Sequence, residues 1–313
     1  SRMAIEIDAD VRDHFGHGHL RISVSDDGKG YVVLRGNKAA RQLSEGERNA
    51  IAFAYFLRSL EADGVDPAQS LVVIDDPMTS MDKESLFAGF SLAEERTRNF
   101  AQVIVLTHDY EYLRLHLRQR TNARKSSEKK ILEGNAEETA FPAIAVLEMV
   151  ATIDIATGSR VSSLRAMPRS LVRHPSEYHY LFLRVGESVM DSDPETLPLL
   201  GNAARRLLEG FISFRAPHGD NFQQKVDSIK ASASIDAVLA GRVVKFLHGM
   251  SHREEPRPSS ALDFPSIDRE LKSALDFIRK ADPKHFEDMC QAVELDHSAL
   301  CATLTGTSGN STP

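Results

Sequence analysis

The sequence predicts an α/β fold with a parallel sheet and an N-terminal β-hairpin, followed by a mostly α-helical domain. Residues 70–75 and 101–107 are short, continuous apolar runs, each preceded by a helical pattern, and such runs are typical of buried parallel strands. Residues 19–35 alternate apolar and polar side chains on both sides of the turn sequence Asp-Asp-Gly-Lys-Gly, which indicates an antiparallel hairpin.

Local signals predict the elements around these strands. A helix is predicted from about Ser44 to Glu61, because Ser44 can cap its N-terminus and Glu47 stands three residues later, as a capping box requires. A second helix is predicted over 82–97, and a further strand over 143–149.

Helical patterns return after Pro175 and continue toward the C-terminus. We therefore expect four parts: an α/β domain, a basic linker, a helical domain and a disordered tail rich in Ser, Thr and Gly, at residues 1–150, 151–174, 175–303 and 304–313.

Composition limits the classes of function. The net charge of −7 argues against general coating of nucleic acid, although a local basic groove is compatible with it. No apolar run approaches the roughly 20 residues that a membrane-spanning helix needs, so no membrane partner is expected. Cys290 and Cys301 are too few for a disulfide framework or a zinc site, and a cytoplasmic protein is expected.

The loop before the first long helix reads Leu-Ser-Glu-Gly-Glu, and two interpretations of it stay open. An ordinary helix start would account for Ser44 and Glu47. Alternatively, Ser44, the Gly46 backbone and the helix N-terminus face a phosphate group.

Acidic side chains follow the first predicted parallel strand, and a histidine follows the second. Asp75 and Asp76 end the first strand, and His108 stands just beyond the second. The carboxyl ends of parallel strands are where α/β sheets bind ligands. Two adjacent carboxylates at this edge predict a division of roles, in which one holds Mg²⁺ and the other orients or deprotonates a water.

These motifs, in this order, resemble those of ABC-type ATPases. "LSEGE" resembles the signature motif, "LVVIDDP" the Walker B strand, "SMD" the D-loop and "VLTHD" the switch histidine. The resemblance implies the C-terminal lobe of an ABC-type ATPase, with ATP and Mg²⁺ as cofactors. It also implies a homodimer bridged by ATP, because in that family the signature loop closes over the nucleotide that a second subunit holds.

The resemblance also implies a role for each matching residue. Ser44 and the Gly46 amide would touch the γ-phosphate. Asp75 would bind Mg²⁺ through water, Asp76 would stand where the family usually has a catalytic glutamate, and His108 would contact the γ-phosphate. Asp76 departs from the family pattern because its carboxylate is one methylene shorter, so hydrolysis is expected to be slow or geometrically shifted. The other residues that these motifs place beside the nucleotide are Glu45, Glu47 and Asp82.

The chain contains no P-loop pattern G-x-x-x-x-G-K-[ST]. Its only Gly-Lys pair, Gly28-Lys29, has Ser23 where the first glycine should be and belongs to the predicted hairpin turn. Without a P-loop this polypeptide cannot cradle the β-phosphate alone. The sequence thus resembles the lobe that follows the coiled coil in long ABC-type ATPases, which implies a P-loop lobe of the same or another protein as partner.

Within that family, the motifs "IDDPMTSMDKESLF" and "LTHDYEYLR" resemble the AAA-13 type, a group that includes the anticodon nucleases of the PrrC and RloC kind. There an Arg-x-x-x-Glu followed by a distant histidine cleaves tRNA, which implies a site of Arg205 and Glu209 with either His248 or His252. The spacing of Arg242 and His248 loosely resembles that of HEPN ribonucleases. From their spacing alone, Arg205 and Glu209 are equally well interpreted as a surface pair on one helix face.

Three hypotheses of function follow from this resemblance. The first is an ATP-gated tRNA ribonuclease of phage defence, and the alternative is a coiled-coil ATPase whose helical domain binds DNA or protein partners without nuclease activity. A third is a stand-alone lobe that completes its site with a separate P-loop protein. The basic runs at 114–130 and 160–174 are either solvated linkers or contacts to nucleic acid. "HFGHGH", residues 14–19, is more simply a flexible loop than a metal site.

Overall fold

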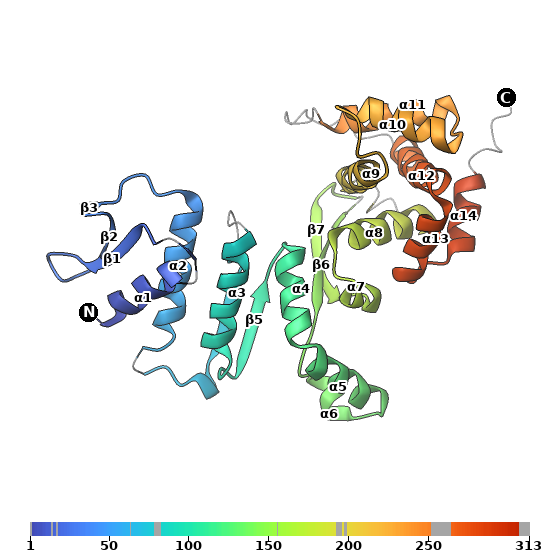
Figure 1. The fold of residues 1–313 in the computed structure, drawn as a ribbon. Coiled ribbons are helices and arrows are strands. Elements are labelled where there is room, and N and C mark those ends of the chain that lie inside the picture. Colours follow the sequence, from blue (N-terminus) through green and yellow to red (C-terminus); the bar gives the residue numbers. More distant parts are fainter. Residues whose placement is uncertain are drawn as a thin grey trace. The chain divides into compact units, whose positions relative to one another are not determined.

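The structure of the protein is a computed structural model (Figure 1), which describes residues 2–13, 15–16, 18–62, 64–77, 83–154, 156–191, 196, 199–251 and 264–306. The chain divides into two compact units, Ser1–Thr121 and Asn122–Pro313, and each has its own apolar core. Within the described ranges, no helix combines the length and the apolar character that crossing a membrane requires.

The first unit begins with a helix that sequence patterns did not predict. Helix α1 (Arg2–Asp13) buries Ile7 and Val11, which lie four residues apart and therefore share one face. An antiparallel sheet follows, with strands in the order β1-β2-β3. Its strands are Leu20–Val24, Tyr31–Arg35 and Lys38–Ala39. Strands β1 and β2 pair along their whole lengths, which confirms the predicted hairpin.

The parallel sheet of the first unit follows in the predicted order of helices and strands. Its elements are α2 (Glu45–Ser59), a 3-10 turn (Pro67–Gln69), β4 (Leu71–Asp75), α3 (Lys83–Thr97), β5 (Gln102–Leu106) and α4 (Tyr110–Gln119). Strands β4 and β5 pair in parallel, with Asp75 opposite Leu106, so the predicted parallel pairing is confirmed. Helices α2 and α3 lie beside each other in Figure 1 and pack together.

The two faces of the β4–β5 sheet differ in burial. Val72 and Ile74 of β4 are buried in the core that the surrounding helices share. The opposite face exposes four apolar side chains, Leu71 (54%), Val73 (48%), Ile104 (36%) and Leu106 (47%). Parallel sheets are usually covered on both faces, so this exposed apolar face is unusual.

The second unit is mostly helical, as the sequence predicts. Its elements are α5 (Thr121–Leu132), α6 (Ala136–Ala140), β6 (Leu147–Ile153), β7 (Arg160–Ala166), α7 (Arg169–Arg173), α8 (Glu177–Asp191), α9 (Gly201–Arg215), α10 (Phe222–Ala233), α11 (Ala237–Ser251), α12 (Phe264–Ala281), α13 (Pro283–Ala292) and α14 (His297–Thr305). Helices from α8 onward form a bundle around buried side chains that include Phe182, Leu207 and Phe277.

The segment 151–174, expected to be a basic linker, instead contributes to an antiparallel hairpin of β6 and β7 and to helix α7. The strand expected over 143–149 accordingly begins at Leu147 and runs to Ile153. The basic charge of this segment favours a linker over the strand β7, but one buried carboxylate, Glu148, pairs with two nearby cations. Glu148 accepts hydrogen bonds from Arg165 at 2.5 Å and from Arg184 of α8 at 2.6 Å, which fixes the hairpin to the bundle.

The basic run at 114–130 and the start of the expected tail also belong to helices. The basic run at 114–130 lies largely in α4 and α5. The expected tail begins inside α14, which extends to Thr305 with Gly306 as its C-cap. Residues 307–313 of that tail lie outside the described residues.

Candidate functional site

Ser44 caps helix α2 as the sequence predicts. Its hydroxyl accepts a hydrogen bond from the Glu47 amide at 3.1 Å, and its own amide donates to Glu47 Oε2 at 2.7 Å, which completes the capping box. Ser44 and Glu45 are exposed and Gly46 is half-buried. The first turn of α2 therefore presents a hydroxyl and backbone amides to the surroundings of the protein, which suits an anionic ligand.

The buried side chain of Glu47 holds the loop that contains Ser44 in place. Its Oε1 atom accepts from His19 Nε2 at 2.7 Å and from Arg35 Nη2 at 2.8 Å, while Oε2 serves the Ser44 amide. The carboxylate is buried, yet the bond with His19, the Ser44 amide and Arg35 together lower its pKa to about 2. Both oxygens of Glu47 are engaged within the protein, so its place in the site is to position Ser44.

His19 and Arg35 contact the candidate site through Glu47, and the sequence patterns did not predict these contacts. They lie at the open end of the hairpin, just before β1 and at the end of β2, and both reach the first turn of α2. The one sequence signal was a pair of basic side chains at that hairpin end, upstream of a capping-box glutamate. His14 and His17, the other histidines of the same segment, lie outside the described residues.

Asp75 and Asp76 lie at the carboxyl end of β4, as predicted. Asp75 is exposed, and Asp76 is half-buried in a left-handed backbone conformation with φ of 44°. The Asp76 amide donates to the Leu106 carbonyl at 2.8 Å, which extends the pairing of β4 with β5 by one residue. Asp75 and Asp76 therefore differ in exposure, and Asp76 adopts a left-handed backbone conformation.

The structure brings Asp76 and His108 together. His108 Nδ1 lies 2.6 Å from Asp76 Oδ2, and Thr107 Oγ1 lies 3.4 Å from Asp76 Oδ1. The same threonine hydroxyl accepts from the Asp109 amide at 3.0 Å, and Asp109 in turn caps α4. The imidazole is 77% exposed, so its second nitrogen can reach a ligand at the edge of the sheet.

This edge of the sheet fits a magnesium nucleotide in its chemistry. Mg²⁺ is commonly held by one or two carboxylates together with phosphate oxygens and water, and Asp75 offers an exposed carboxylate of that kind. Asp82, the D-loop residue expected beside the nucleotide, lies outside the described residues, as do Ser80 and Met81.

In the helical unit, Arg205 and Glu209 bond to each other. Arg205 Nε lies 2.6 Å from Glu209 Oε1 across one turn of α9, and both side chains are about three-quarters buried. His248 is exposed near the end of α11, and His252 lies outside the described residues. Among the residues that the structure describes, no hydrogen bond or ion pair joins His248 to Arg205 or Glu209.

Arg242, whose spacing from His248 resembles the HEPN pattern, is directed toward α12. Its guanidinium lies 3.4 Å from Ser273 Oγ and 3.8 Å from Glu270 Oε1. Burial raises the pKa of Glu270, and Arg242 opposes this effect. Over the described parts of the chain, no group of three or more His, Cys, Asp or Glu side chains is arranged to hold a metal ion.

A search of curated proteins found no match to the chain. The family model AAA_13, described as an AAA domain, matches residues 2–278, which include both the sheet edge with Asp76 and His108 and most of the helical unit. The chain therefore belongs to the AAA_13 family, which places it in the AAA/ABC-like class of ATPases.

Proposed function

We propose that this chain is the signature-motif half of an ABC-type ATPase that couples ATP binding and hydrolysis to its helical domain. The observation that carries the proposal is the contact of Asp76 with His108 at the carboxyl ends of two paired parallel strands. A carboxylate beside an exposed imidazole at this edge is an arrangement suited to water activation next to a terminal phosphate.

Each residue of the edge has a distinct task in this proposal. Asp75 binds Mg²⁺, which neutralises charge on the β- and γ-phosphates when it is bound. Asp76 accepts a hydrogen bond from the attacking water and orients it toward the phosphorus. His108 engages Asp76 through Nδ1, which leaves Nε2 to donate to a γ-phosphate oxygen.

The signature loop serves the nucleotide of a second subunit in the proposed ATP-bridged homodimer. Ser44 and the Gly46 amide donate to the γ-phosphate, with Glu45 and Asp82 beside them. Glu47 does not reach the phosphate but keeps the cap of α2 in place through His19 and Arg35. Support comes from the exposure of Ser44 at a helix N-terminus, where the partial positive charge favours an anion.

A P-loop lobe of the same or another protein completes the proposed site. The exposed face of the β4–β5 sheet, with its four aliphatic side chains, supports this partner, because parallel sheets are covered on both faces in folded proteins. A separate P-loop protein and a P-loop lobe on a longer form of this chain are both compatible with this surface.

For the helical domain we propose a metal-independent tRNA ribonuclease, in line with the resemblance to anticodon nucleases of phage defence. Glu209 or a histidine, His248 or His252, takes the 2′-OH proton, and Arg205 stabilises the pentacoordinate phosphate. The short contact between Arg205 and Glu209 supports their acting as a unit. The cytoplasm, where tRNA is found, is the proposed location.

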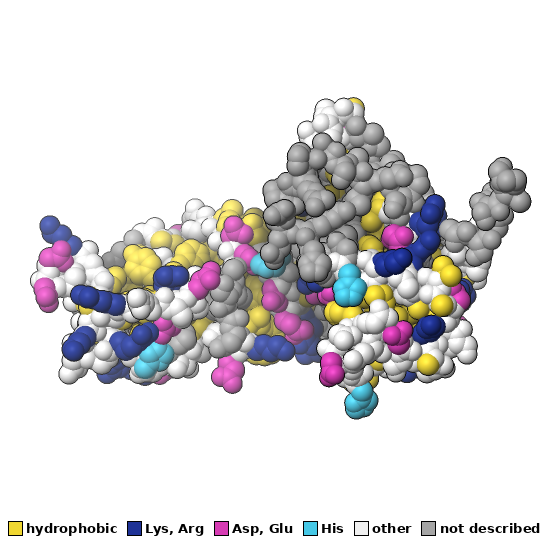
Figure 2. Space-filling model, turned by 90° about the horizontal axis from the view of Figure 1, so that it is seen from above, with side chains coloured by type: hydrophobic (Ala, Val, Ile, Leu, Met, Phe, Trp, Pro, Cys, Tyr) yellow, Lys and Arg dark blue, Asp and Glu magenta, His cyan; other side chains and the backbone are white. Residues whose placement is uncertain are grey.

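One observation favours the alternative, in which the helical domain binds DNA or protein partners without nuclease activity. Most cations of the basic run at 114–130 form ion pairs with nearby carboxylates, which reduces the net positive charge that this run presents to a nucleic-acid backbone. The cations that form such ion pairs are Arg114, Arg120, Arg124, Lys129 and Lys130. On the face seen in Figure 2, basic and acidic side chains are interspersed.

The test of the ATPase proposal is reconstitution with a P-loop lobe. The chain alone and the chain joined to or mixed with a P-loop lobe of the same family are assayed for Mg-ATP hydrolysis, with Asp26→Asn, in the exposed hairpin turn, as a matched control. Hydrolysis that needs both lobes and survives in the Asp26 variant supports the proposal. Hydrolysis by the chain alone, or none with any P-loop lobe, contradicts it.

A further inference from the structure

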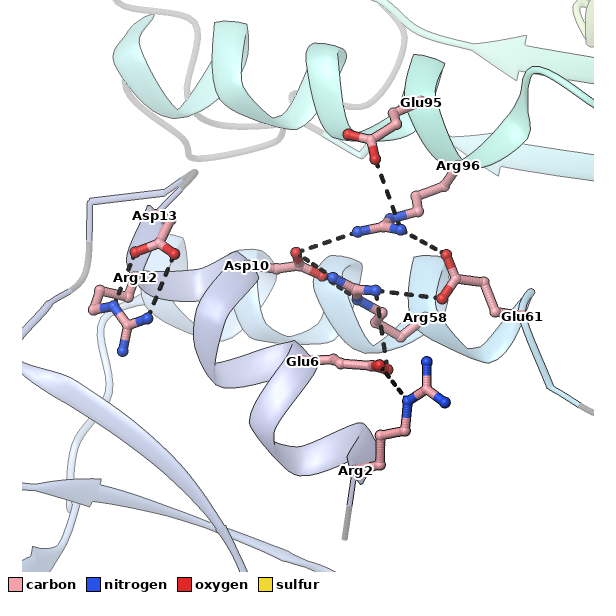
Figure 3. A network of polar contacts seen from close by, with 9 residues as sticks. All are labelled: Arg2, Glu6, Asp10, Arg12, Asp13, Arg58, Glu61, Glu95 and Arg96. Atoms are coloured by element: carbon pink, nitrogen blue, oxygen red, sulfur yellow. Dashed lines mark hydrogen bonds and ion pairs between the residues drawn. The ribbon is translucent and has the colours of Figure 1, made fainter.

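One buried carboxylate on α1 joins the ends of the two longest helices of the first unit. Asp10 is 3% exposed and accepts two hydrogen bonds from Arg58, Nε to Oδ2 at 2.5 Å and Nη2 to Oδ1 at 2.7 Å. Arg96 Nη2 approaches the same Oδ1 at 3.6 Å. Figure 3 shows both guanidinium groups directed at Asp10 from different helices.

Glu61 closes this contact into a ring of alternating charge. Its Oε1 accepts from Arg96 Nη1 at 2.7 Å, and its Oε2 lies 3.3 Å from Arg58 Nη1. Each arginine therefore contacts both acids, and each acid contacts both arginines (Figure 3). Networks of this kind hold geometry more firmly than isolated pairs, because each charge is fixed by two partners.

The two arginines occupy equivalent places on their helices. Arg58 lies in the last turn of α2, and Arg96 lies in the last turn of α3. The opposite end of α2 carries the Ser44 cap, and the opposite end of α3 follows directly on the D-loop residue Asp82. Helices α2 and α3 thus have equal lengths, and each contacts Asp10 through an arginine of its last turn, at the end opposite its first turn.

We propose that Asp10 is a positioning residue, which sets the spacing of α2 and α3 and thereby the spacing between the first turns of these two helices. This inference rests on the proposed function, which assigns the starts of α2 and α3 to the nucleotide site. Packed helices transmit a displacement along their length with little bending, so a shift at the Asp10 end reaches the nucleotide end.

Burial separates this contact from ordinary surface ion pairs on the same helix. Arg12 and Asp13, also drawn in Figure 3, form an exposed pair whose side chains are 40% and 58% exposed. Loss of an exposed pair changes little, whereas removing one member of a buried pair leaves the other charge without compensation. Asp13→Asn on α1 is therefore a control for Asp10→Asn on the same helix.

The first measurement follows the helix spacing itself in this chain. Spin labels are placed at the exposed positions Arg48 and Glu84, in the first turns of α2 and α3, after Cys290 and Cys301 are replaced by serine. We expect a shifted or broadened distance distribution in Asp10→Asn and an unchanged one in Asp13→Asn. Arg96→Gln keeps both hydrogen bonds between Arg58 and Asp10. It is therefore a milder variant in case Asp10→Asn fails to fold.

The second measurement follows ATP turnover in the complete ATPase that includes a P-loop lobe. We expect kcat to fall about 2- to 30-fold in the Asp10 and Arg96 variants with little change in KM, because ATP still binds but the first turns of α2 and α3 are displaced relative to each other. Asp10→Glu should recover part of this loss. A lowered melting temperature with an unchanged distance distribution and unchanged kcat would overturn the inference.

The two measurements separate failure of this inference from failure of the proposed function. If the label distances change but no form of the protein hydrolyses ATP, then Asp10 positions the helices and the ATPase proposal is wrong. If the complete protein hydrolyses ATP but the Asp10 and Arg96 variants match the wild type in label distances and in kcat, then the ATPase proposal stands and Asp10 has no positioning role.

Discussion

His108 Nδ1 lies 2.6 Å from Asp76 Oδ2, so that the ends of two neighbouring parallel strands share one polar contact. Asp75, one residue earlier, is exposed and keeps its carboxylate for another partner. Asp76 is half-buried and has a left-handed backbone conformation with φ of 44°. Two adjacent aspartates thereby acquire different surroundings and can serve different steps of one reaction.

The first prediction separates these two aspartates in the complete ATPase. Asp76→Asn should leave Mg-ATP binding intact and lower turnover by about 10²–10⁴-fold, because the attacking water loses the carboxylate that orients it. Asp75→Asn should instead weaken Mg²⁺-dependent nucleotide binding. Calorimetric binding and steady-state hydrolysis, measured on both variants, decide the matter. Equal loss of binding in both variants would show that the roles are misassigned.

The second prediction concerns Glu47 and the decrease in the free energy of unfolding at acidic pH. Its pKa is lowered from 4.5 to about 2 by His19, the Ser44 amide and Arg35, so the stabilisation is fully present above pH about 4.5 and is lost as the pH falls toward 2. Glu47→Gln should lower the free energy of unfolding by about 1.5–3 kcal/mol at pH 7, the range for hydrogen bonds to a charged group. Urea denaturation at pH 7, 4.5 and 3 measures the difference from wild type.

The matched control for this prediction is Glu45→Gln, an exposed neighbour in the same turn. Its free energy of unfolding should follow the wild type across the whole pH range. The difference between Glu47→Gln and wild type should shrink as the pH falls below 4.5. A difference that stays constant down to pH 3 would contradict the assignment of Glu47 as the titrating group.

Local signals in the sequence predict several parts of this site. The capping box of Ser44 and Glu47 involves residues three apart, and the strand ends that hold Asp76 and His108 follow from two apolar runs. The position of Asp76 and His108 at one edge of the sheet also followed from a general rule, because parallel strands place their carboxyl ends at one edge, whereas their contact is seen only in the structure. Local spacing and one rule of sheet topology were sufficient there.

The parts that sequence analysis missed depend on contacts between distant segments. The bond of Arg35 with Glu47 requires the hairpin to lie against the start of α2, and nothing in local spacing shows this. The basic run at 114–130 was interpreted from its charge alone, but Arg120 lies 2.7 Å from Glu94, which is on another helix. Net charge along a sequence cannot show which cations are neutralised by residues that are near only in space.

The third prediction concerns acid sensitivity of the helical unit. Burial, with smaller effects from His174 and His285, lowers the pKa of His179 below its usual 6.5, and burial likewise lowers that of His285. The rings of His174 and His179 stack at 5.4 Å, and Tyr178 shares a 2.8 Å hydrogen bond with His285. Protons therefore bind the unfolded chain more readily than the folded one just below pH 6.5.

Stability of this unit should be fully present above pH 6.5 and should decline as the pH falls through the lowered pKa values of His179 and His285. Thermal melts between pH 8 and pH 5 measure the decline. His179→Gln should reduce the slope, whereas His218→Gln, at an exposed position, should leave it unchanged. A slope that is the same in both variants would show that other groups bind the protons.

The fourth prediction compares two helical glycines of the bundle. A Cβ atom at Gly186 of α8 would lie 2.5 Å from Leu295 Cδ1, so Gly186→Ala forces this leucine to move. Overpacking of this kind costs about 1–3 kcal/mol. Apart from its chain neighbours and the backbone of its own helix, Gly241 of α11 has no heavy atom within 4 Å of the corresponding position, so Gly241→Ala should stabilise by up to about 1 kcal/mol. A higher melting temperature for Gly241→Ala than for Gly186→Ala is the expected result.

The last prediction decides between the nuclease and the partner-binding hypotheses. Arg205→Ala removes the guanidinium that contacts Glu209 on α9, while Arg206→Ala on the same helix removes only a pair with Glu177 at a more exposed position. If Arg205 stabilises the reacting phosphate, its loss should abolish tRNA cleavage while ATP hydrolysis survives, and Arg206→Ala should retain both activities. Glu209→Gln should lower cleavage by about 10²–10⁴-fold if the glutamate takes the 2′-OH proton.

Sequencing of cellular tRNA ends, under conditions in which the ATPase is active, compares the strains. Cleaved anticodon loops with 2′,3′-cyclic ends in the wild type and the Arg206 variant alone support the nuclease. Intact loops in every strain would instead favour a helical domain that binds partners, which agrees with the ion pairing of the cations at 114–130.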